Sequence, residues 1–405
     1  MQDISVNEYD PAVTLPPVPP PIVAPTTFVP PEAYPFRFTG KAGEFFGIWI
    51  VNLFLNIITL GIYSARAKVR KKRYFYGHTW VADANFEYHG NPIAILKGRL
   101  IAVAVFGAYS GIGHFMPKVA AILAFGLFAA APWFIARSMA FNAFNSSYRN
   151  IRFRFYASYI DVLKAIWPVA LVLVFPLLMP ELDAAEKVKP PTVFWVIALL
   201  QFMAIFAVYP YAIGAIKKLH VNHSQYGVAP FTIGVGIGAF YKIFLLALLL
   251  GFAMVIVIGI AVGIVVAATM VMGINGGVGA YIMPTLVTIL AIVVYFSMGS
   301  MLLAYSKSRF GNLVFNHTRL DQQVSFNSSL RLTKLAKIYF VNMFAILFSF
   351  GLAIPWAVIR VMRYRAECLS LQASSSLDEF IGGVSAQVGA TGEELGEFFS
   401  IDLSL

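Results

Sequence analysis

Three histidines in short polar tripeptides are the side chains of this sequence best suited to chemistry. A related tripeptide has serine at that place, and the four read Gly77-His78-Thr79, Asn145-Ser146-Ser147, Asn222-His223-Ser224 and Asn316-His317-Thr318. His220 stands three residues before His223, but a closed zinc site needs four ligands, and no cysteine or carboxylate is close in the sequence. Since a metal ligand would not be exchanged for serine in one copy, the pattern favours a repeated turn position, and we predict no metal and no cofactor.

Other catalytic arrangements are missing from the sequence. It has no nucleophile beside a base, no paired carboxylates and no Walker-type loop, and the glycine-rich run that begins at Gly234 lacks the βαβ context of a dinucleotide site. The long apolar segments contain no acidic or basic residues, whereas ion-coupled transporters need such groups inside the membrane. We therefore predict that the protein is not an enzyme and is not driven by an ion gradient.

Polar amides within apolar segments are a further candidate set. Asn52 and Asn342 occupy equivalent places near the two ends of the chain. Amides in a membrane commonly join helices by hydrogen bonds worth roughly 0.6–2 kcal/mol, which is the more conservative interpretation. They could also line a path, and the positions that would form such a polar ring are Asn52, Asn142, Gln201, Asn275 and Asn342.

The composition is that of a membrane protein. Hydrophobic residues make up 59% of the 405 residues and charged residues only 12%. About 20 apolar residues span a bilayer as a helix, and five charge-free segments are long enough: Leu100 to Met116, Val119 to Ala136, Thr192 to Ile216, Ile243 to Met272 and Tyr281 to Ser306. The shorter segment Ala165 to Pro180 is the predicted sixth span, because the next helix needs a partner that returns the chain.

An internal repeat organises the chain. Four phenylalanines each precede a lysine by 11 residues, in the pairs Phe86/Lys97, Phe153/Lys164, Phe231/Lys242 and Phe326/Lys337, and a partial copy begins at Phe36. The two ends also match at an offset of 290 residues, as in Asn52/Asn342 and Gly61/Gly351. The four lysines fall at predicted helix entries, where ammonium groups reach the interface, so we predict that they contact anionic lipid headgroups.

Each repeat is expected to contain a strand with the phenylalanine, membrane helices and a second strand with the His/Asn-Ser/Thr signature. The predicted fold is an all-α polytopic membrane protein, a pseudo-repeated helical bundle with short cytoplasmic β-hairpins between repeats. Strands with open edges cannot lie in hydrocarbon, so the hairpins are placed outside the bilayer. Their side carries 27 of the 30 basic residues, which predicts a cytoplasmic location.

Charge and proline content divide the chain into three regions. Residues 1–35 are predicted to be a disordered, proline-rich acidic tail, residues 36–365 the membrane domain, and residues 366–405 an acidic cytoplasmic tail. Phe45 to Tyr63 and Ile338 to Val358 are either single spans or re-entrant segments that turn near Thr59 to Gly61 and near Phe350 to Pro355. The net charge of +11 follows from the cytoplasmic loops, so we predict no nucleic-acid partner.

Several motifs together resemble a known family. Phe36-Arg37-Phe38-Thr39-Gly40, Val51-Asn52, Thr59-Leu60-Gly61-Ile62-Tyr63 and Arg73-Tyr74 are similar in order and spacing to the YjgN-like family of bacterial inner-membrane proteins. The resemblance covers about residues 34 to 365, and neither tail contributes to it. It implies an inner-membrane location and a membrane fold, but that family has no known function from which site residues could be carried over. The charge distribution, and not the resemblance, predicts that both tails lie in the cytoplasm.

Two functions remain open. The first is a passive pore or facilitator for a small solute, with the polar ring as its lining. The second is a non-enzymatic scaffold whose basic cytoplasmic face binds anionic lipid or a partner protein. Analogy with other repeat-built bundles favours the first slightly. The sequence predicts neither the protein partners nor the oligomeric state.

Overall fold

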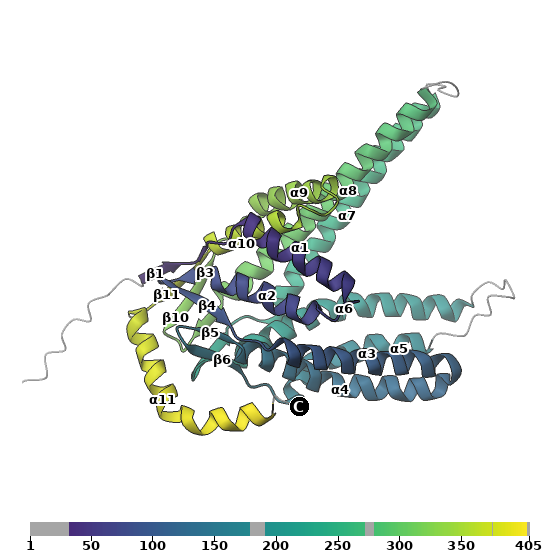
Figure 1. Cartoon of the computed structure of the whole chain (residues 1–405). Coiled ribbons are helices and arrows are strands. Elements are labelled where there is room, and N and C mark those ends of the chain that lie inside the picture. Colours follow the sequence, from purple (N-terminus) through teal and green to yellow (C-terminus); the bar gives the residue numbers. More distant parts are fainter. Residues whose placement is uncertain (1–31, 179–190, 272–278, 375, 403–405) are drawn as a thin grey trace, which may run out of the picture. The chain divides into compact units, whose positions relative to one another are not determined.

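Five consecutive β-α-α-β units follow one another along the chain (Figure 1). The computed structural model describes residues 32–178, 191–271, 279–374 and 376–402. The first unit holds β1 (Glu32–Pro35), β2 (Arg37–Phe38), α1 (Ala42–Ile58), α2 (Ser64–Gly77) and β3 (Thr79–Val81). The second holds β4 (Ala84–Tyr88), α3 (Pro92–Phe115), α4 (Pro117–Phe144) and β5 (Ser146–Tyr148).

The remaining three units have the same order of elements. The third consists of β6 (Ile151–Phe155), α5 (Tyr159–Leu178), α6 (Thr192–Asn222) and β7 (Ser224–Tyr226). The fourth consists of β8 (Ala229–Ile233), α7 (Ile237–Val271), α8 (Gly279–Asn316) and β9 (Thr318–Leu320). The fifth consists of β10 (Val324–Ser328), α9 (Leu332–Phe348), α10 (Ile354–Glu367) and β11 (Leu369–Ala373), and α11 (Leu377–Asp402) follows it.

All eleven strands belong to one antiparallel sheet that returns to its starting point. The strand order is β1-β11-β10-β9-β8-β7-β6-β5-β4-β3-β2, so β1 and β2 stand at its two ends. Only Phe36 separates these two strands in the chain, and its N–H donates to the carbonyl of Leu369 over 3.0 Å. The strands therefore form a ring, which leaves no long unpaired edge.

The apolar helices support the predicted helical membrane protein, but the sheet corrects the all-α class, because the β-hairpins between repeats are joined into one sheet. Neighbouring units are joined by tight turns of left-handed residues, such as Ala82-Asp83 with φ of 45° and 58° and Arg149-Asn150 with φ of 47° and 65°. Such turns suit the twist of antiparallel strands. Short-range alternation in the sequence indicates the individual strands, but it does not indicate that β1 pairs with β11, more than 330 residues later.

The same sheet also changes the predicted domain boundaries. Residues 32–35, assigned above to the first tail, form β1, and residues 369–373, assigned to the second tail, form β11. The last strand of the fifth unit is not predicted from the repeat, because Cys368-Leu369 stands where the other units have His or Asn followed by Ser or Thr. Most of the proline-rich region, residues 1–31, lies outside the described residues.

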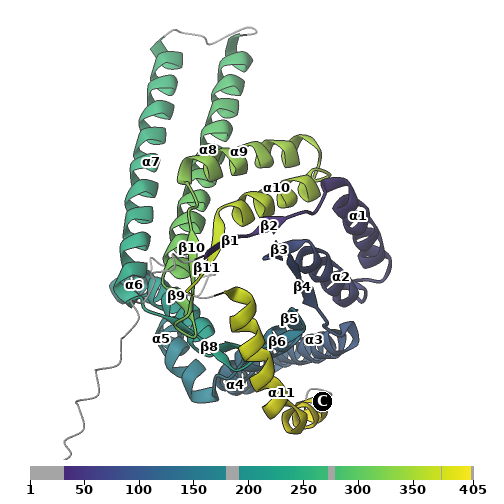
Figure 2. The same ribbon diagram turned by 90° about the vertical axis from the view of Figure 1, so that its left-hand side faces the viewer.

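Each unit sends a pair of helices away from the strands (Figure 2). Within the residues that the structure describes, five helical segments are long and apolar enough to cross a membrane: Pro92–Phe115, Ile122–Phe144, Thr192–Asn222, Ile237–Ile264 and Thr285–Asn316. They expose many large apolar side chains, such as Phe106 and Phe125. The sixth predicted span, Ala165 to Pro180, overlaps α5 and ends outside the described residues, and α5 is not among the five.

The first and last helix pairs are short and share one turn geometry. Leu60 and Gly61 have φ of 49° and 89°, and Phe350 and Gly351 have φ of 50° and 90°. In both turns the glycine N–H donates over 2.8 Å to the carbonyl five residues earlier. The chain thus turns at both segments for which bends were considered, whereas their re-entrant position in a membrane stays a prediction.

The left-handed turn predicts opposite effects for two glycine substitutions in one helix pair. Gly61→Ala should destabilise the protein by about 1–2 kcal/mol, because a Cβ strains a residue with positive φ. Gly47→Ala should stabilise it by roughly 1 kcal/mol, because Gly47 lies inside α1 with open space around its Cβ position. Thermal unfolding of the purified protein in detergent, followed by circular dichroism, measures both changes. Equal effects of the two substitutions would contradict this account of the turn.

Candidate ligand cavity inside the strand ring

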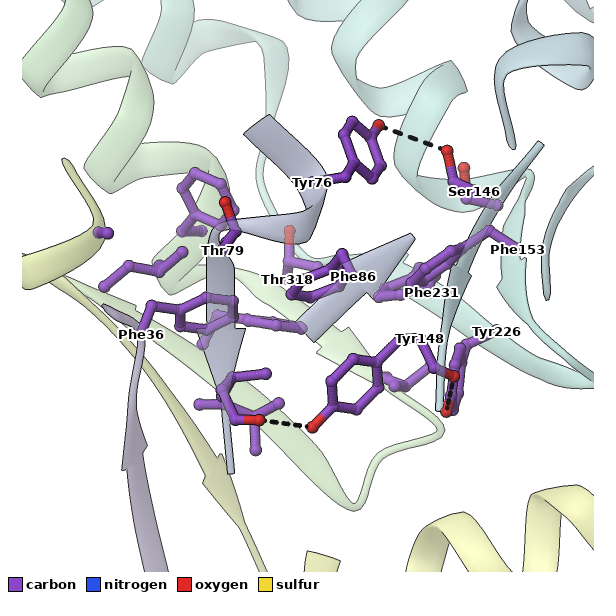
Figure 3. A pocket seen from close by; sticks show the side chains of 18 of the residues that line it. Phe36, Tyr76, Thr79, Phe86, Ser146, Tyr148, Phe153, Tyr226, Phe231 and Thr318 are labelled. Atoms are coloured by element: carbon purple, nitrogen blue, oxygen red, sulfur yellow. Dashed lines mark hydrogen bonds between the residues drawn. The ribbon is translucent and has the colours of Figure 1, made fainter. Parts of the chain in front are cut away.

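The strand ring encloses a cavity of about 690 Å³ whose lining is mainly apolar (Figure 3). Five phenylalanines, one from each unit, line it: Phe36, Phe86, Phe153, Phe231 and Phe326. Phe36 lies between β1 and β2, and the other four lie in the first strands of their units. From Phe36 to Phe326, successive ring centroids are 6.2–6.4 Å apart, with interplanar angles of 12–28°. These are the residues of the sequence repeat, and we call them the phenylalanine ring.

The phenylalanine ring follows from the repeat and from the pairing of the strands. Because each unit places its phenylalanine at the same register position, ring closure brings five distant residues side by side. Offset stacked aromatic pairs contribute roughly 0.5–1.5 kcal/mol each beyond the burial of their area. The sequence repeat therefore identifies the phenylalanines, whereas only the closed sheet shows that they lie next to one another.

Two tyrosines on neighbouring strands use their hydroxyl groups to hold the ring together. The Tyr148 hydroxyl donates to the carbonyl of Val81 over 2.7 Å, and the Tyr226 hydroxyl donates to the carbonyl of Tyr148 over 3.0 Å. Burial raises the pKa of both phenols, so both stay protonated and keep their donor hydrogens. Their polar atoms thus serve the strands, and the surface left to the cavity is largely aromatic.

The His/Asn signature caps helices. The ring Nδ1 atoms of His78, His223 and His317 bond the backbone carbonyl four residues earlier over 2.7–3.0 Å, and the Asn145 amide does the same over 2.8 Å. Asn145, and not Ser146 as the tripeptides suggested, therefore stands at the histidine position of the second unit. The hydroxyl that follows each of them also donates to the carbonyl four residues before it, in Thr79, Ser146, Ser224 and Thr318. The last carbonyls of α2, α4, α6 and α8 thus find donors.

The Nε2 atoms of His78 and His223 lie near single carboxylates and not in a group of metal ligands. His78 Nε2 lies 3.8 Å from Glu44, and His223 Nε2 lies 3.5 Å from Asp161, each carboxylate being in the first turn of its own unit's first helix. Hydrogen bonds from Ser158 lower the pKa of Asp161, which is therefore anionic at neutral pH. Within the described residues no three His, Cys, Asp or Glu side chains gather as metal ligands would.

The candidate amides occupy different environments. Asn142 lines the cavity, whereas Asn52 and Asn342 are buried in short helices. The Asn342 amide donates to the carbonyl of Ala357 over 3.1 Å and so joins α9 to α10. Gln201 is half-buried in α6, and Asn275 lies outside the described residues. Of the four positions that the structure describes, only Asn142 is thus placed at the cavity, and a polar lining formed by the set stays a prediction.

The repeat lysines lie on the outside of the protein. Lys97 on α3, Lys164 on α5, Lys242 on α7 and Lys337 on α9 are all exposed, each near the start of its helix. A long, flexible side chain at this place is free to reach a membrane surface. Their contact with lipid headgroups stays a prediction.

A different set of basic residues lies at the end of the ring where the helices begin, and sequence reasoning missed it. Lys72 donates a hydrogen bond to Asn142, and Lys217 lies close enough to Lys307 and Arg365 to be repelled by both. We call Lys72, Lys217, Lys307 and Arg365 the basic mouth cluster. They precede the signature position of their units by 6, 6, 10 and 3 residues. These spacings keep to one helical face, which is the signal that could have revealed them.

The helix α11 covers the opposite end of the ring, where the tight turns lie. Its residues Leu377, Phe380 and Ile381 line the cavity, and a side chain added at Gly227 in the β7–β8 turn would collide with Val384 and Val388. An ion pair joins Asp378 to Arg149 in the β5–β6 turn. The cavity is thus bounded by α11 at one end and by the helix ends with their basic cluster at the other.

Comparison with known proteins places these features in a family context. Residues 33–398 match the family described as bacterial protein of unknown function (DUF898). The chain is 26% identical over 351 residues to inner membrane protein YjgN of Salmonella typhimurium, which covers 83% of this chain and 87% of that protein. It is 30% identical over 152 residues to inner membrane protein YjgN of Escherichia coli O157:H7, covering 37% of the chain and 36% of that protein. No solved structure matches it significantly.

These likenesses confirm the resemblance inferred from the motifs and correct its extent. The predicted limits were about residues 34 to 365, with no contribution from the tails, but the family match continues to residue 398. The additional residues include β11 and most of α11, which complete the ring and cover its end.

The helix-capping role of the signature predicts which substitution is tolerated at His317. His317→Asn should leave stability nearly unchanged, because Asn145 bonds the equivalent carbonyl in the second unit. His317→Ala should lower the free energy of unfolding by about 1 kcal/mol, the usual net contribution of one hydrogen bond. Thermal unfolding with and without a chelator tests this. If both variants lost the same stability, and the wild type lost as much with chelator, a metal-binding role would replace the capping role.

Proposed function

The chain belongs to the DUF898 family of bacterial proteins of unknown function, and from that premise we propose that it is a non-enzymatic membrane protein that holds the apolar part of a lipid-like molecule inside the strand ring. One observation carries this proposal: the closed ring of strands surrounds a cavity of about 690 Å³ lined by five phenylalanines. Ligand pockets typically measure roughly 300–1,000 Å³ and are lined by apolar and aromatic side chains.

The position of the cavity relative to the helices supports an apolar ligand drawn from the bilayer. All five helix pairs leave the ring at the same end. In every unit the two helices join the C-terminal end of one strand to the N-terminal end of its antiparallel neighbour, and these two ends lie together at one rim of the sheet. The described spans bury almost none of their apolar surface within the protein, as expected for helices that face lipid. A molecule that moves from the bilayer along these helices would meet the ring at its helix-side end.

We place the ring on the cytoplasmic side of the inner membrane, with both ends of the chain in the cytoplasm. The support is the charge distribution, because the side of the strands carries 27 of the 30 basic residues. The relatives named inner membrane protein support the inner membrane as the location and carry no information on the orientation. On this orientation the exposed repeat lysines Lys97, Lys164, Lys242 and Lys337 would meet the anionic headgroups of the inner leaflet.

A passive pore or facilitator for a small solute is the second candidate. The cavity reaches from the helix ends to α11, which is the observation in its favour. Two features rank it lower: residues of α11 line the far end of the cavity, and the lining is mainly apolar instead of polar. A scaffold that binds lipid or a partner protein through its outer basic face is compatible with a ligand in the ring and does not compete with it.

Photocrosslinking from inside the ring tests the proposed function. We expect benzoylphenylalanine at Phe231, in the phenylalanine ring, to form adducts with the mass of a phospholipid when the protein is irradiated in lipid nanodiscs. The same probe at Phe240, which is fully buried between protein elements, should form none, and at the exposed Phe106 it should react with bulk lipid. Intact-protein mass spectrometry gives the adduct masses. If Phe231 behaved like Phe240, or reacted only with water, an apolar ligand in the ring would be excluded and a pore favoured.

A further inference from the structure

The basic mouth cluster lies against the same cavity as the phenylalanine ring. Arg365 lines that cavity directly, and Lys217 lies one helical turn before His220, which also lines it. Lys217 and Arg365 repel each other electrostatically, as do Lys217 and Lys307. Lys72 reaches the cavity through its hydrogen bond to Asn142. Lys217, Lys307 and Arg365, from three units, therefore form one close group beside the cavity, and Lys72 approaches the cavity from a fourth unit through Asn142.

These cations have no carboxylate partner in the part of the chain that the structure describes. The ion pairs found there involve other basic residues, such as Arg37 with Asp83, Arg149 with Asp378 and Lys334 with Glu367. Cations close together at a partly enclosed site raise the free energy of the protein unless an anion joins them. A focused positive potential of this kind also attracts an anionic group.

Attraction to helix ends does not account for the whole cluster. The C-termini of α2, α6, α8 and α10 converge on the mouth, and a helix C-terminus attracts cations within its last turn. Lys307, however, lies nine residues before Asn316, the last residue of α8, and Lys217 lies five residues before Asn222, the last of α6. Side-chain donors already occupy the final carbonyls of α2, α6 and α8.

We propose that the basic mouth cluster binds the anionic headgroup, phosphoryl or carboxylate, of the molecule whose apolar part occupies the strand ring. The ligand is accordingly an anionic amphiphile. This inference rests on the proposed function, because it names the second half of the same ligand. It differs from headgroup contacts of the outer lysines, which are exposed, do not line the cavity and would act on the bulk bilayer.

The lipid selectivity of the crosslink tests the headgroup site. Full-length protein with benzoylphenylalanine at position 231 is irradiated in nanodiscs of equal parts dioleoyl-phosphatidylglycerol and dioleoyl-phosphatidylcholine. We expect the wild type to yield mostly phosphatidylglycerol adducts. The double variant Lys217→Gln, Arg365→Gln should lose that preference by on the order of thirtyfold, since each basic group near an anionic lipid contributes roughly fivefold. The matched variant Lys97→Gln, Lys164→Gln loses the same charge on the outside and should keep the preference.

The outcomes separate the two proposals. Lipid adducts with equal capture of both lipids in all three proteins would overturn the headgroup site and leave the proposed function standing. A wild type without lipid adducts would overturn the function itself. Lys307→Gln alone, with a smaller expected loss of preference, serves if the double variant does not fold. A last arm measures thermal stabilisation by inorganic phosphate in the wild type and in the double variant Lys217→Gln, Arg365→Gln. If phosphate stabilised only the wild type, and the crosslinks showed no lipid preference, the cluster would bind free phosphate and the headgroup proposal would be contradicted.

Discussion

The pairing of the two ends of the sheet is the constraint on which the other features depend. Backbone N–H and C=O groups at an open strand edge need partners, and here the last strand finds them on the first. Phe36 lies at the point of closure: β1 on one side of it pairs with β11, and β2 on the other side pairs with β3. One short segment thus completes a ring that the other four units leave open.

Closure of the ring places equivalent residues of the five units around one cavity, so that the repeated residues together form a site. In all five units the residue three positions after the repeat phenylalanine donates its N–H to the carbonyl of the signature position, over 2.8–3.1 Å. These equivalent bonds fix the phenylalanines at one level and the helix ends at another. An aromatic lining next to a basic rim is the arrangement from which we infer an amphiphilic ligand. A single unit contributes only one phenylalanine and at most one cation, so neither the aromatic lining nor the basic rim exists before the units are joined.

The sequence predicted the parts of this structure that are local and repeated. The 11-residue spacing after Phe86, Phe153, Phe231 and Phe326 located the strands, and charge-free segments located five helices that could span a membrane. It did not predict the pairing of β1 with β11, because the fifth unit carries Cys368 and Leu369 where the others carry polar residues. Nor did it predict the basic mouth cluster, whose members stand at different distances from the signature and meet only after the helices are placed.

Crosslinking across the closing strand pair tests the central claim most directly. Ala33 and Gln372 are register partners on β1 and β11, and Ser325 is the partner of Gln372 on its other side. In a Cys368→Ser background, Ala33→Cys with Gln372→Cys should form a disulfide on mild oxidation, because cross-strand Cβ atoms lie roughly 4.5–5.5 Å apart. Ala33→Cys with Ser325→Cys should not, because two strand spacings, about 10 Å, separate those positions. Equal yields from the two pairs, or none from the first, would contradict a closed ring.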